Sequence, residues 1–147
     1  KVGECNDFML RHWVERWEEA EIRGEMRLRP DHYPALFLPT HGQLGTCDYD
    51  RDLELQEAPE CPEGHQIRGQ LLYLRDGTAA LPILDRFEGF FPGSRSEYLR
   101  VAVSVLTESG PVACWTYTGV GRPVEEWPRL EEWPPAGLVM KRTVARK

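Results

Sequence analysis

Residues 99–117 read LRVAVSVLTESGPVACWTY, and this stretch has the strongest local pattern in the chain. Its first half alternates large apolar residues with smaller or polar ones: Leu99, Val101, Val103 and Val105 against Arg100, Ala102 and Ser104. Such alternation is typical of a strand with two different faces. A second run spans 112–117, and the connection at 107–110 contains Gly110. We therefore predict an antiparallel hairpin.

Further strands are predicted upstream of this hairpin. Residues 22–28 alternate apolar or small side chains with charged ones, as in a strand with one wet face. Residues 67–74 are apolar on both faces, which is typical of a central strand or of a barrel. Prolines interrupt residues 33–38, so we expect a loop or a short edge strand there. The strands at 22–28, 67–74, 99–106 and 112–117 should share one sheet or barrel.

Two helices are expected beside this sheet. The first would follow Asn6 or Asp7, because the apolar residues after them have the spacing of one buried helix face: Leu10, Trp13, Val14 and Trp17. The second would cover residues 81–87 and end at Gly89, and Pro82 should keep it short. The predicted class is α+β, a small mixed β-barrel or sheet flanked by short helices.

Length and charge limit the function classes. A chain of 147 residues supports one domain with a continuous core. Its net charge of −6 argues against nucleic acid as the main partner, because phosphate binding needs a positive face. The sequence has no apolar window long enough for a membrane span and no signal-peptide pattern. We therefore expect a cytoplasmic protein with no membrane partner.

The negative charge is concentrated in residues 47–64. This segment has one basic residue, Arg51, and seven acidic ones: Asp48, Asp50, Asp52, Glu54, Glu57, Glu60 and Glu63. A separately charged segment that contains proline is typical of a solvated excursion on the surface. We expect it to lie outside the core, because this many unpaired charges cannot be buried.

Cysteine spacing gives no metal or disulfide signature. The four cysteines form no CxxC pair, and we expect them to be reduced. Two alternatives involve the acidic excursion: a disulfide between Cys47 and Cys61, or a zinc site formed by these two residues with His41 and His65. The spacing lacks the tight knuckle of structural zinc sites, so we interpret all four as ordinary loop residues.

One short stretch has an unusual chemical environment. Glu88 lies in the last turn of the predicted helix, within the sequence LDRFEGFF at 84–91. The negative end of a helix disfavours a carboxylate, and Phe87, Phe90 and Phe91 can reduce its hydration. Both effects favour the protonated acid, which suits a general base working near neutral pH. The alternative is that Glu88 points to water and Gly89 merely ends the helix.

Four blocks together resemble the gamma-glutamylcyclotransferase-like family: GQLLYL at 69–74, LDRFEG at 84–89, YLRV at 98–101 and CWTY at 114–117. Gly24 and the YPAL sequence at 33–36 precede them in the matching order. The resemblance covers roughly residues 1–120 and leaves 121–147 as a Pro- and Trp-rich C-terminal extension. It implies a small β-barrel flanked by helices, with a cavity that holds a γ-glutamyl group.

The resemblance also implies an enzyme and its site residues. The acid of the LDxxEG block corresponds to Glu88, as catalytic general acid and base. Tyr98, Tyr117 and Gly89 are implied to bind the substrate. The implied reaction is an intramolecular aminolysis that converts a small γ-glutamyl amino acid, peptide or amine to 5-oxoproline and a free amine. It implies no cofactor and no metal.

The beginning of the sequence departs from the family pattern. Family members open with a strand ending in Tyr-Gly-Thr-Leu or Tyr-Gly-Ser-Leu, whose turn supplies backbone N–H groups to the substrate. Residues 1–6, KVGECN, resemble the stretch just after that motif. We therefore expect the motif to lie outside this sequence. A second interpretation stays open beside the enzyme: a non-catalytic module that binds a ligand or a partner on the same fold.

Overall fold

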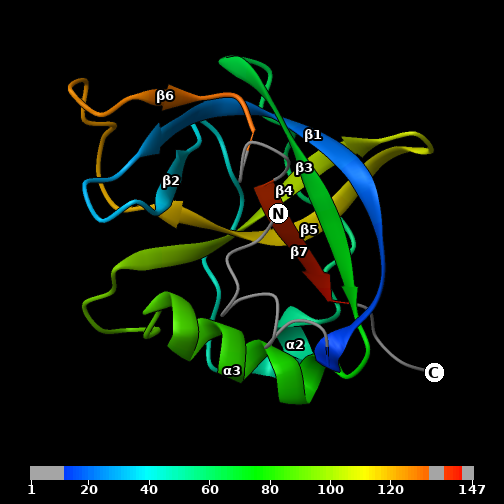
Figure 1. Ribbon diagram of the computed structural model, residues 1–147. Coiled ribbons are helices and arrows are strands. Elements are labelled where there is room, and N and C mark those ends of the chain that lie inside the picture. Colours follow the sequence, from blue (N-terminus) through cyan, green and yellow to red (C-terminus); the bar gives the residue numbers. More distant parts are fainter. Residues whose placement is uncertain (1–11, 133–137, 144–147) are drawn as a thin grey trace.

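The computed structural model describes residues 12–132 and 138–143, and for 138–143 it describes the backbone alone. A seven-stranded mixed sheet forms its centre, and helix α3 lies across one end (Figure 1). The helices are α2 (Tyr49–Asp52) and α3 (Gly77–Glu88). The strands are β1 (Val14–Leu28), β2 (Pro34–Phe37), β3 (His65–Leu74), β4 (Tyr98–Thr107), β5 (Gly110–Gly119), β6 (Arg129–Leu130) and β7 (Leu138–Thr143). This arrangement confirms the α+β class.

The strand order is β2-β1-β3-β7-β5-β4, with β6 paired to β1. The β3–β7 pairing is parallel and the other pairings are antiparallel, so the sheet is mixed as predicted. β4 and β5 form the predicted hairpin, from the Tyr98–Gly119 pair to the Thr107–Gly110 pair. β3 lies between β1 and β7, which confirms a central strand, and β2 is the predicted short edge strand.

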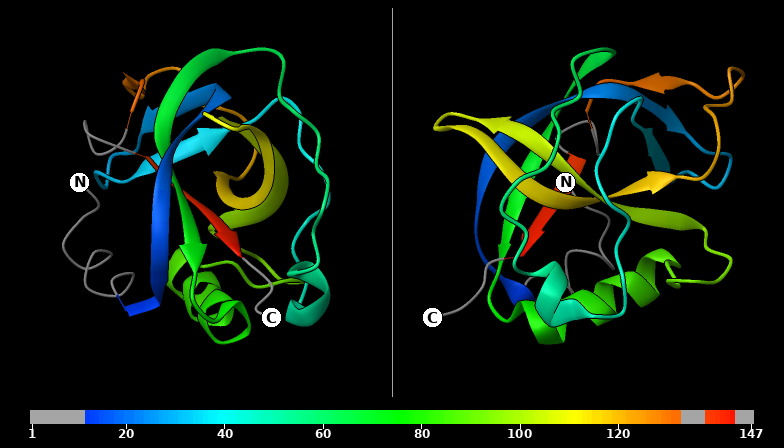
Figure 2. Two further views of the ribbon diagram at one scale, coloured as in Figure 1. Left: turned by 90° about the vertical axis from the view of Figure 1, so that its right-hand side faces the viewer. Right: turned by 180° about the vertical axis from the view of Figure 1, so that it is seen from behind.

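The sheet curls strongly but does not close into the expected barrel (Figure 2). Barrel closure would need a continuous ladder between β4, at one end of the strand order, and β1. Here β1 meets β4 at a single residue pair, Glu21 and Leu106. Loop segments occupy the rest of the β4 edge: Leu44 bridges Val101, and Ser104 N–H donates to Pro59 O. The barrel prediction is therefore wrong, because loops take the hydrogen bonds that closure would need.

The prediction of a first helix reaching Trp17 is wrong at its C-terminal end. His12 and Trp13 are helical, but the chain is already in β1 from Val14 onward. Val14 pairs with Leu74 and Trp17 with Leu72, so β1 follows the whole length of β3. Pairing with a distant strand overrides the local helical spacing. Asn6, Asp7 and Leu10 lie outside the described residues.

Helix α3 is longer than expected. Its cap is Asp76, whose side chain accepts a hydrogen bond from Ala79 N–H, and it runs for 12 residues with Pro82 inside. Proline removes the bond to the carbonyl four residues earlier, which here belongs to Thr78 in the exposed first turn. That carbonyl can be hydrated, so the helix tolerates Pro82. Gly89 ends α3 as predicted, with φ of 72°.

The acidic excursion is attached to the sheet rather than fully solvated. Asp52, Leu53 and Cys61 are buried, and Trp115 Nε1–H donates to Asp52 O at 2.9 Å. Asp52 can be buried because a cation opposes it, as described below. Cys47 and Cys61 are both free thiols, so the alternative disulfide is absent. Within the described part of the chain, no cluster of His, Cys, Asp and Glu could hold a metal ion.

The end of the chain also joins the sheet. β6 pairs with β1, and β7 lies between β3 and β5. The sequence pattern predicted neither strand within residues 121–147, and the domain boundary at residue 120 stays a prediction. None of the helices in the described ranges is long and apolar enough to cross a membrane.

Candidate active site at the end of helix α3

Glu88 is the last residue of α3 and is half-buried. Gly89 follows in the left-handed conformation, and its backbone N–H donates to Arg86 O at 3.2 Å. Glu97 N–H donates to Gly89 O at 2.8 Å, which closes the loop between α3 and β4. This loop brings the end of the helix next to Tyr98, the first residue of β4.

Tyr98 and Tyr117 lie within the electrostatic influence of Glu88. The Tyr98 hydroxyl donates to Pro34 O at 2.8 Å. Burial raises the pKa of Tyr98 to about 12, and the charge of Glu88 adds to the rise. Burial also raises the pKa of Tyr117 well above its usual value, with contributions from Asp85 and Glu88. The structure thus brings together three of the residues that the family resemblance singled out.

The three phenylalanines near Glu88 differ in their surroundings. Phe90 is buried and packs in the same cluster as Tyr117. Phe87 and Phe91 are 39% and 48% exposed. Apolar shielding of this region therefore comes from Phe90, while Phe87 and Phe91 lie at the surface.

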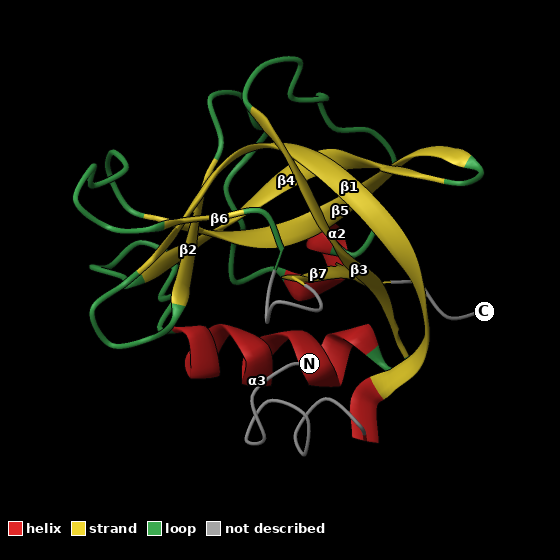
Figure 3. Cartoon of the chain, turned by 45° about the horizontal axis from the view of Figure 1, so that its top comes forward, coloured by secondary structure: helices red, strands yellow, loops and turns green. Residues whose placement is uncertain are grey.

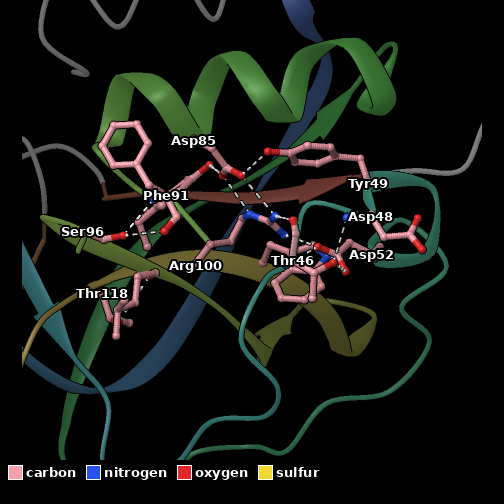
Figure 4. Close-up of polar contacts among 12 residues, drawn as sticks. Thr46, Asp48, Tyr49, Asp52, Asp85, Phe91, Ser96, Arg100 and Thr118 are labelled. Atoms are coloured by element: carbon pink, nitrogen blue, oxygen red, sulfur yellow. Dashed lines mark hydrogen bonds and ion pairs between the residues drawn. The ribbon is translucent and has the colours of Figure 1, made fainter. Parts of the chain in front are cut away.

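A buried ionic network that the sequence reading missed lies directly beneath this helix end (Figure 4). Arg100 is fully buried on β4. Its Nε lies 2.8 Å from Asp85 Oδ1 and its Nη2 lies 3.1 Å from Asp85 Oδ2, a bidentate pair. Its Nη1 lies 3.1 Å from Asp52 Oδ2, and Nη2 also donates to Thr46 O. One guanidinium thus joins α3, the acidic excursion and the sheet.

Hydroxyl groups and aromatic rings complete this network. Tyr117 donates its hydroxyl proton to Asp85 Oδ1 at 2.6 Å, and Tyr49 donates to Asp85 Oδ2 at 2.9 Å. The Arg100 guanidinium carbon lies 4.7 Å from the Trp115 ring centroid and 5.4 Å from that of Phe90. Burial lowers the pKa of Arg100, but its bonds to Asp85 more than compensate and raise it. Arg100 therefore stays charged at every working pH.

The network fixes the helix end that carries Glu88. Asp85 lies three residues before Glu88, almost one helical turn away, and is held from β4 through Arg100 and from β5 through Tyr117. A signal for this was present in the sequence, because Asp85 follows Leu81 and Leu84 on the apolar face of α3. A carboxylate on an apolar helix face needs a buried partner.

Folding stability should fall as the pH rises from about 10 to about 12. Burial, followed by the charge of Asp85, raises the pKa of Tyr49 to about 12. An unfolded tyrosine loses its proton near pH 10. Over this range the unfolded chain binds fewer protons than the folded one, so the stability present below pH 10 is progressively lost. Urea unfolding at pH 9, 10.5 and 11.5 measures this, and Tyr49→Phe should reduce the slope; a flat profile would contradict the expectation.

Gly89→Ala should destabilise the fold by about 1–2 kcal/mol, because an L side chain is strained at a φ of 72°. An added Cβ would also lie 3.1 Å from the Glu97 Cβ. Gly93→Ala is the matched control, with a φ of 79° and no neighbour within 4 Å of the added Cβ. We expect the smaller loss for Gly93→Ala in urea unfolding. Equal losses would show that the contact with Glu97 is unimportant.

The structure is a curled mixed sheet with helix α3 across one end, and the acid Glu88 lies at the end of that helix. Sequence comparisons identify the family. The model of the family described as Gamma-glutamyl cyclotransferase, AIG2-like, matches residues 57–134. This match covers more than half of the chain, and the chain belongs to that family. Comparison with curated proteins and with solved structures gave no significant match.

Family membership supports a cyclotransferase-type function on small γ-glutamyl substrates. All four sequence blocks on which the resemblance was based lie inside the matched range. The roles of Glu88, Gly89, Tyr98 and Tyr117 stay predictions.

Proposed function

We propose that the protein is an enzyme that converts a small γ-glutamyl amino acid, peptide or amine to 5-oxoproline and a free amine. The observation that carries this proposal is the position of Glu88. It is half-buried at the end of α3, three residues after Asp85, which holds Tyr117, and the loop closed by the Glu97–Gly89 hydrogen bond brings this helix end next to Tyr98. A single acid with aromatic neighbours is what an intramolecular proton-transfer reaction requires.

In the proposed reaction Glu88 carries one proton between two nitrogens. Its carboxylate accepts a proton from the substrate α-amino nitrogen as that nitrogen attacks the γ-carbonyl carbon. The protonated acid then delivers this proton to the amide nitrogen as the old C–N bond breaks. The products are the five-membered ring of 5-oxoproline and the free amine. Because both reacting groups belong to one molecule, the ring closure has a high effective molarity, and the protein mainly has to fold the substrate and move the proton.

The two tyrosines and Gly89 are proposed to shape the substrate site. Tyr98 commits its hydroxyl proton to Pro34 O, so its oxygen would contact the substrate as an acceptor, for instance of an N–H of the neutral α-amino group. The raised pKa of Tyr98, about 12 through burial, keeps the phenol neutral during turnover. Tyr117 is held by Asp85 and would form a rigid wall. Gly89 would contribute its backbone beside Glu88, because Glu97 lies where a side chain at Gly89 would point.

Product analysis tests the proposal. The purified full-length protein is incubated with γ-glutamyl amino acids, γ-glutamyl dipeptides and γ-glutamyl amines, and free 5-oxoproline is measured by mass spectrometry against a protein-free blank. The α-glutamyl isomers are the control, because cyclisation at their N-terminus releases no free 5-oxoproline. We expect release from at least one γ-glutamyl compound. Binding of these compounds by calorimetry without any turnover would replace the enzyme with the non-catalytic binding module.

A further inference from the structure

A cavity of about 460 Å³ lies between Gly24 and Glu25 of β1, the starts of β3 and β4, and the ends of β2 and β5 with the loops that follow these two strands. Phe37, Leu38 and Leu99 give it an apolar floor. Its volume is within the range of small-molecule sites. Neither Glu88 nor Tyr98 nor Tyr117 lines it.

The lining of this cavity differs from the residues of the candidate active site. The Leu99–Thr118 register pair lines it, whereas the next pair, Arg100–Tyr117, belongs to the buried network beneath α3. Leu99 also packs against the cluster that contains Phe90 and Tyr117, so the cavity and the candidate site share this one apolar residue. Helix α3 covers one end of the sheet, and several connecting loops gather at the other end (Figure 3).

Close backbone contact forms one wall of the cavity. Gly64 has a φ of +113°, and a Cβ added there would lie 2.7 Å from the backbone nitrogen of Gly24. Only glycine permits this approach. The contact places His65, the next residue, at the rim.

Arginine is present at the rim although the whole chain has a net charge of −6: Arg122 lines the cavity, and Arg129 contacts the lining residue His65. Arg122 is exposed and has no ion-pair or hydrogen-bond partner among the described residues. His65 Nε2 lies 2.9 Å from Arg129 Nη1, and because arginine only donates, this nitrogen accepts. The neutral ring therefore carries its proton on Nδ1, as a further donor. Glu25 is the acidic residue of the lining, and Arg27 neutralises it through a 2.6 Å hydrogen bond from Nε.

We propose that this cavity binds a small organic carboxylate with an apolar body. The body would occupy the floor of Phe37, Leu38 and Leu99, and the carboxylate would pair with the unpartnered guanidinium of Arg122. Arg129 places a second positive charge behind His65. An ion pair with Arg122 needs no existing contact to be broken, which favours the anion over an uncharged ligand of the same shape. The inference is independent of the proposed function.

Nuclear magnetic resonance titration tests the site with 4-phenylbutyrate as the probe. 4-Phenylbutanol has the same body without the charge, and butyrate has the charge with a much smaller body. We expect 4-phenylbutyrate to bind more tightly than either, and to shift the backbone amides of Gly64, Gly119 and Gly121. Shifts centred on Gly89, or equal affinity for the alcohol, would overturn the proposal.

Two substitutions of opposite effect sharpen the test. Arg122→Gln removes the exposed guanidinium and should weaken 4-phenylbutyrate binding about fivefold. Glu25→Gln frees the charge of Arg27 and should tighten it. Arg51→Gln, an equal charge change on the exposed side of α2, is the matched control and should leave the affinity unchanged. If Arg122→Gln and Arg51→Gln have the same effect, the proposed carboxylate site is wrong.

Discussion

Replacing Glu88 by glutamine should reduce turnover of a γ-glutamyl substrate by roughly 10²–10⁴-fold, the usual effect of a positioned general acid–base group. Glutamine keeps the size and much of the hydrogen-bonding capacity of the side chain, but it can neither accept nor deliver the proton. Glu88 is only half-buried, and the bonds of the Arg100 guanidinium run to Asp85, Asp52 and Thr46. The fold should therefore survive, which urea unfolding can verify beside the release of 5-oxoproline.

Glu97→Gln is the matched control for this substitution. Glu97 lies beside the same helix end, its side chain is 70% exposed, and its carboxylate lies 3.7 Å from the Arg29 guanidinium. The charge change is the same, and we expect turnover within about twofold of the unaltered protein, since an exposed pair contributes little. A folded Glu88→Gln protein with unchanged turnover would show that Glu88 does not carry the proton.

Features set by neighbouring residues could be predicted from the sequence. The β4–β5 hairpin follows from alternation on both sides of a short turn, and the end of α3 follows from a glycine after an apolar helical stretch. Glu88, the acid of the candidate site, could be predicted together with the helix end, because it lies directly before that glycine. The family resemblance rests on these same local blocks.

Features set by distant pairing could not be predicted in this way. The spacing of Trp13, Val14 and Trp17 fits a helix, yet β3 pairs with β1 from Val14 to Gly24, and this pairing makes the segment a strand. β7 pairs with β3 across more than 60 residues of sequence, and no local pattern indicates that partner. Ladder hydrogen bonds decide both cases, and the two strands that form each ladder are far apart in the chain.

The net charge of residues 47–64 also led to the prediction that the whole acidic excursion lies outside the core. The sum over residues 47–64 treats its carboxylates as equivalent, but Asp52 is 5% exposed while Asp48 and Asp50 lie in the solvent. Asp52 differs because Arg100 and the Thr46 N–H and hydroxyl groups all contact its carboxylate. A charge is buried where one specific cation meets it, and the sequence pattern did not indicate that Arg100 is the cation that meets Asp52.

That arginine carries the second large prediction: Arg100→Met should destabilise the fold by about 3–5 kcal/mol. Methionine fills similar space without the charge. Asp85 and Asp52, both at 5% exposure or less, would then lose the cation that both contact. Removing one partner of a buried ion pair is costly, because the remaining charge stays desolvated. Urea unfolding of the variant measures the loss.

Arg68→Met is the matched control for Arg100→Met. It separates the effect of removing a buried charge from the effect of replacing arginine by methionine. Arg68 lies on β3 of the same sheet, pairs with Glu132 at 2.9 Å and is 60% exposed, so its loss should cost no more than about 1 kcal/mol. If Arg100→Met is too unstable to purify, urea unfolding of the Arg100→Met/Asp85→Asn double variant can be measured instead. The neutral amide oxygen can still accept from Tyr49 or Tyr117, so this variant should be more stable than Arg100→Met alone. Equal losses for Arg100→Met and Arg68→Met, or a double variant no more stable than Arg100→Met, would contradict the view that Arg100 acts by neutralising Asp85.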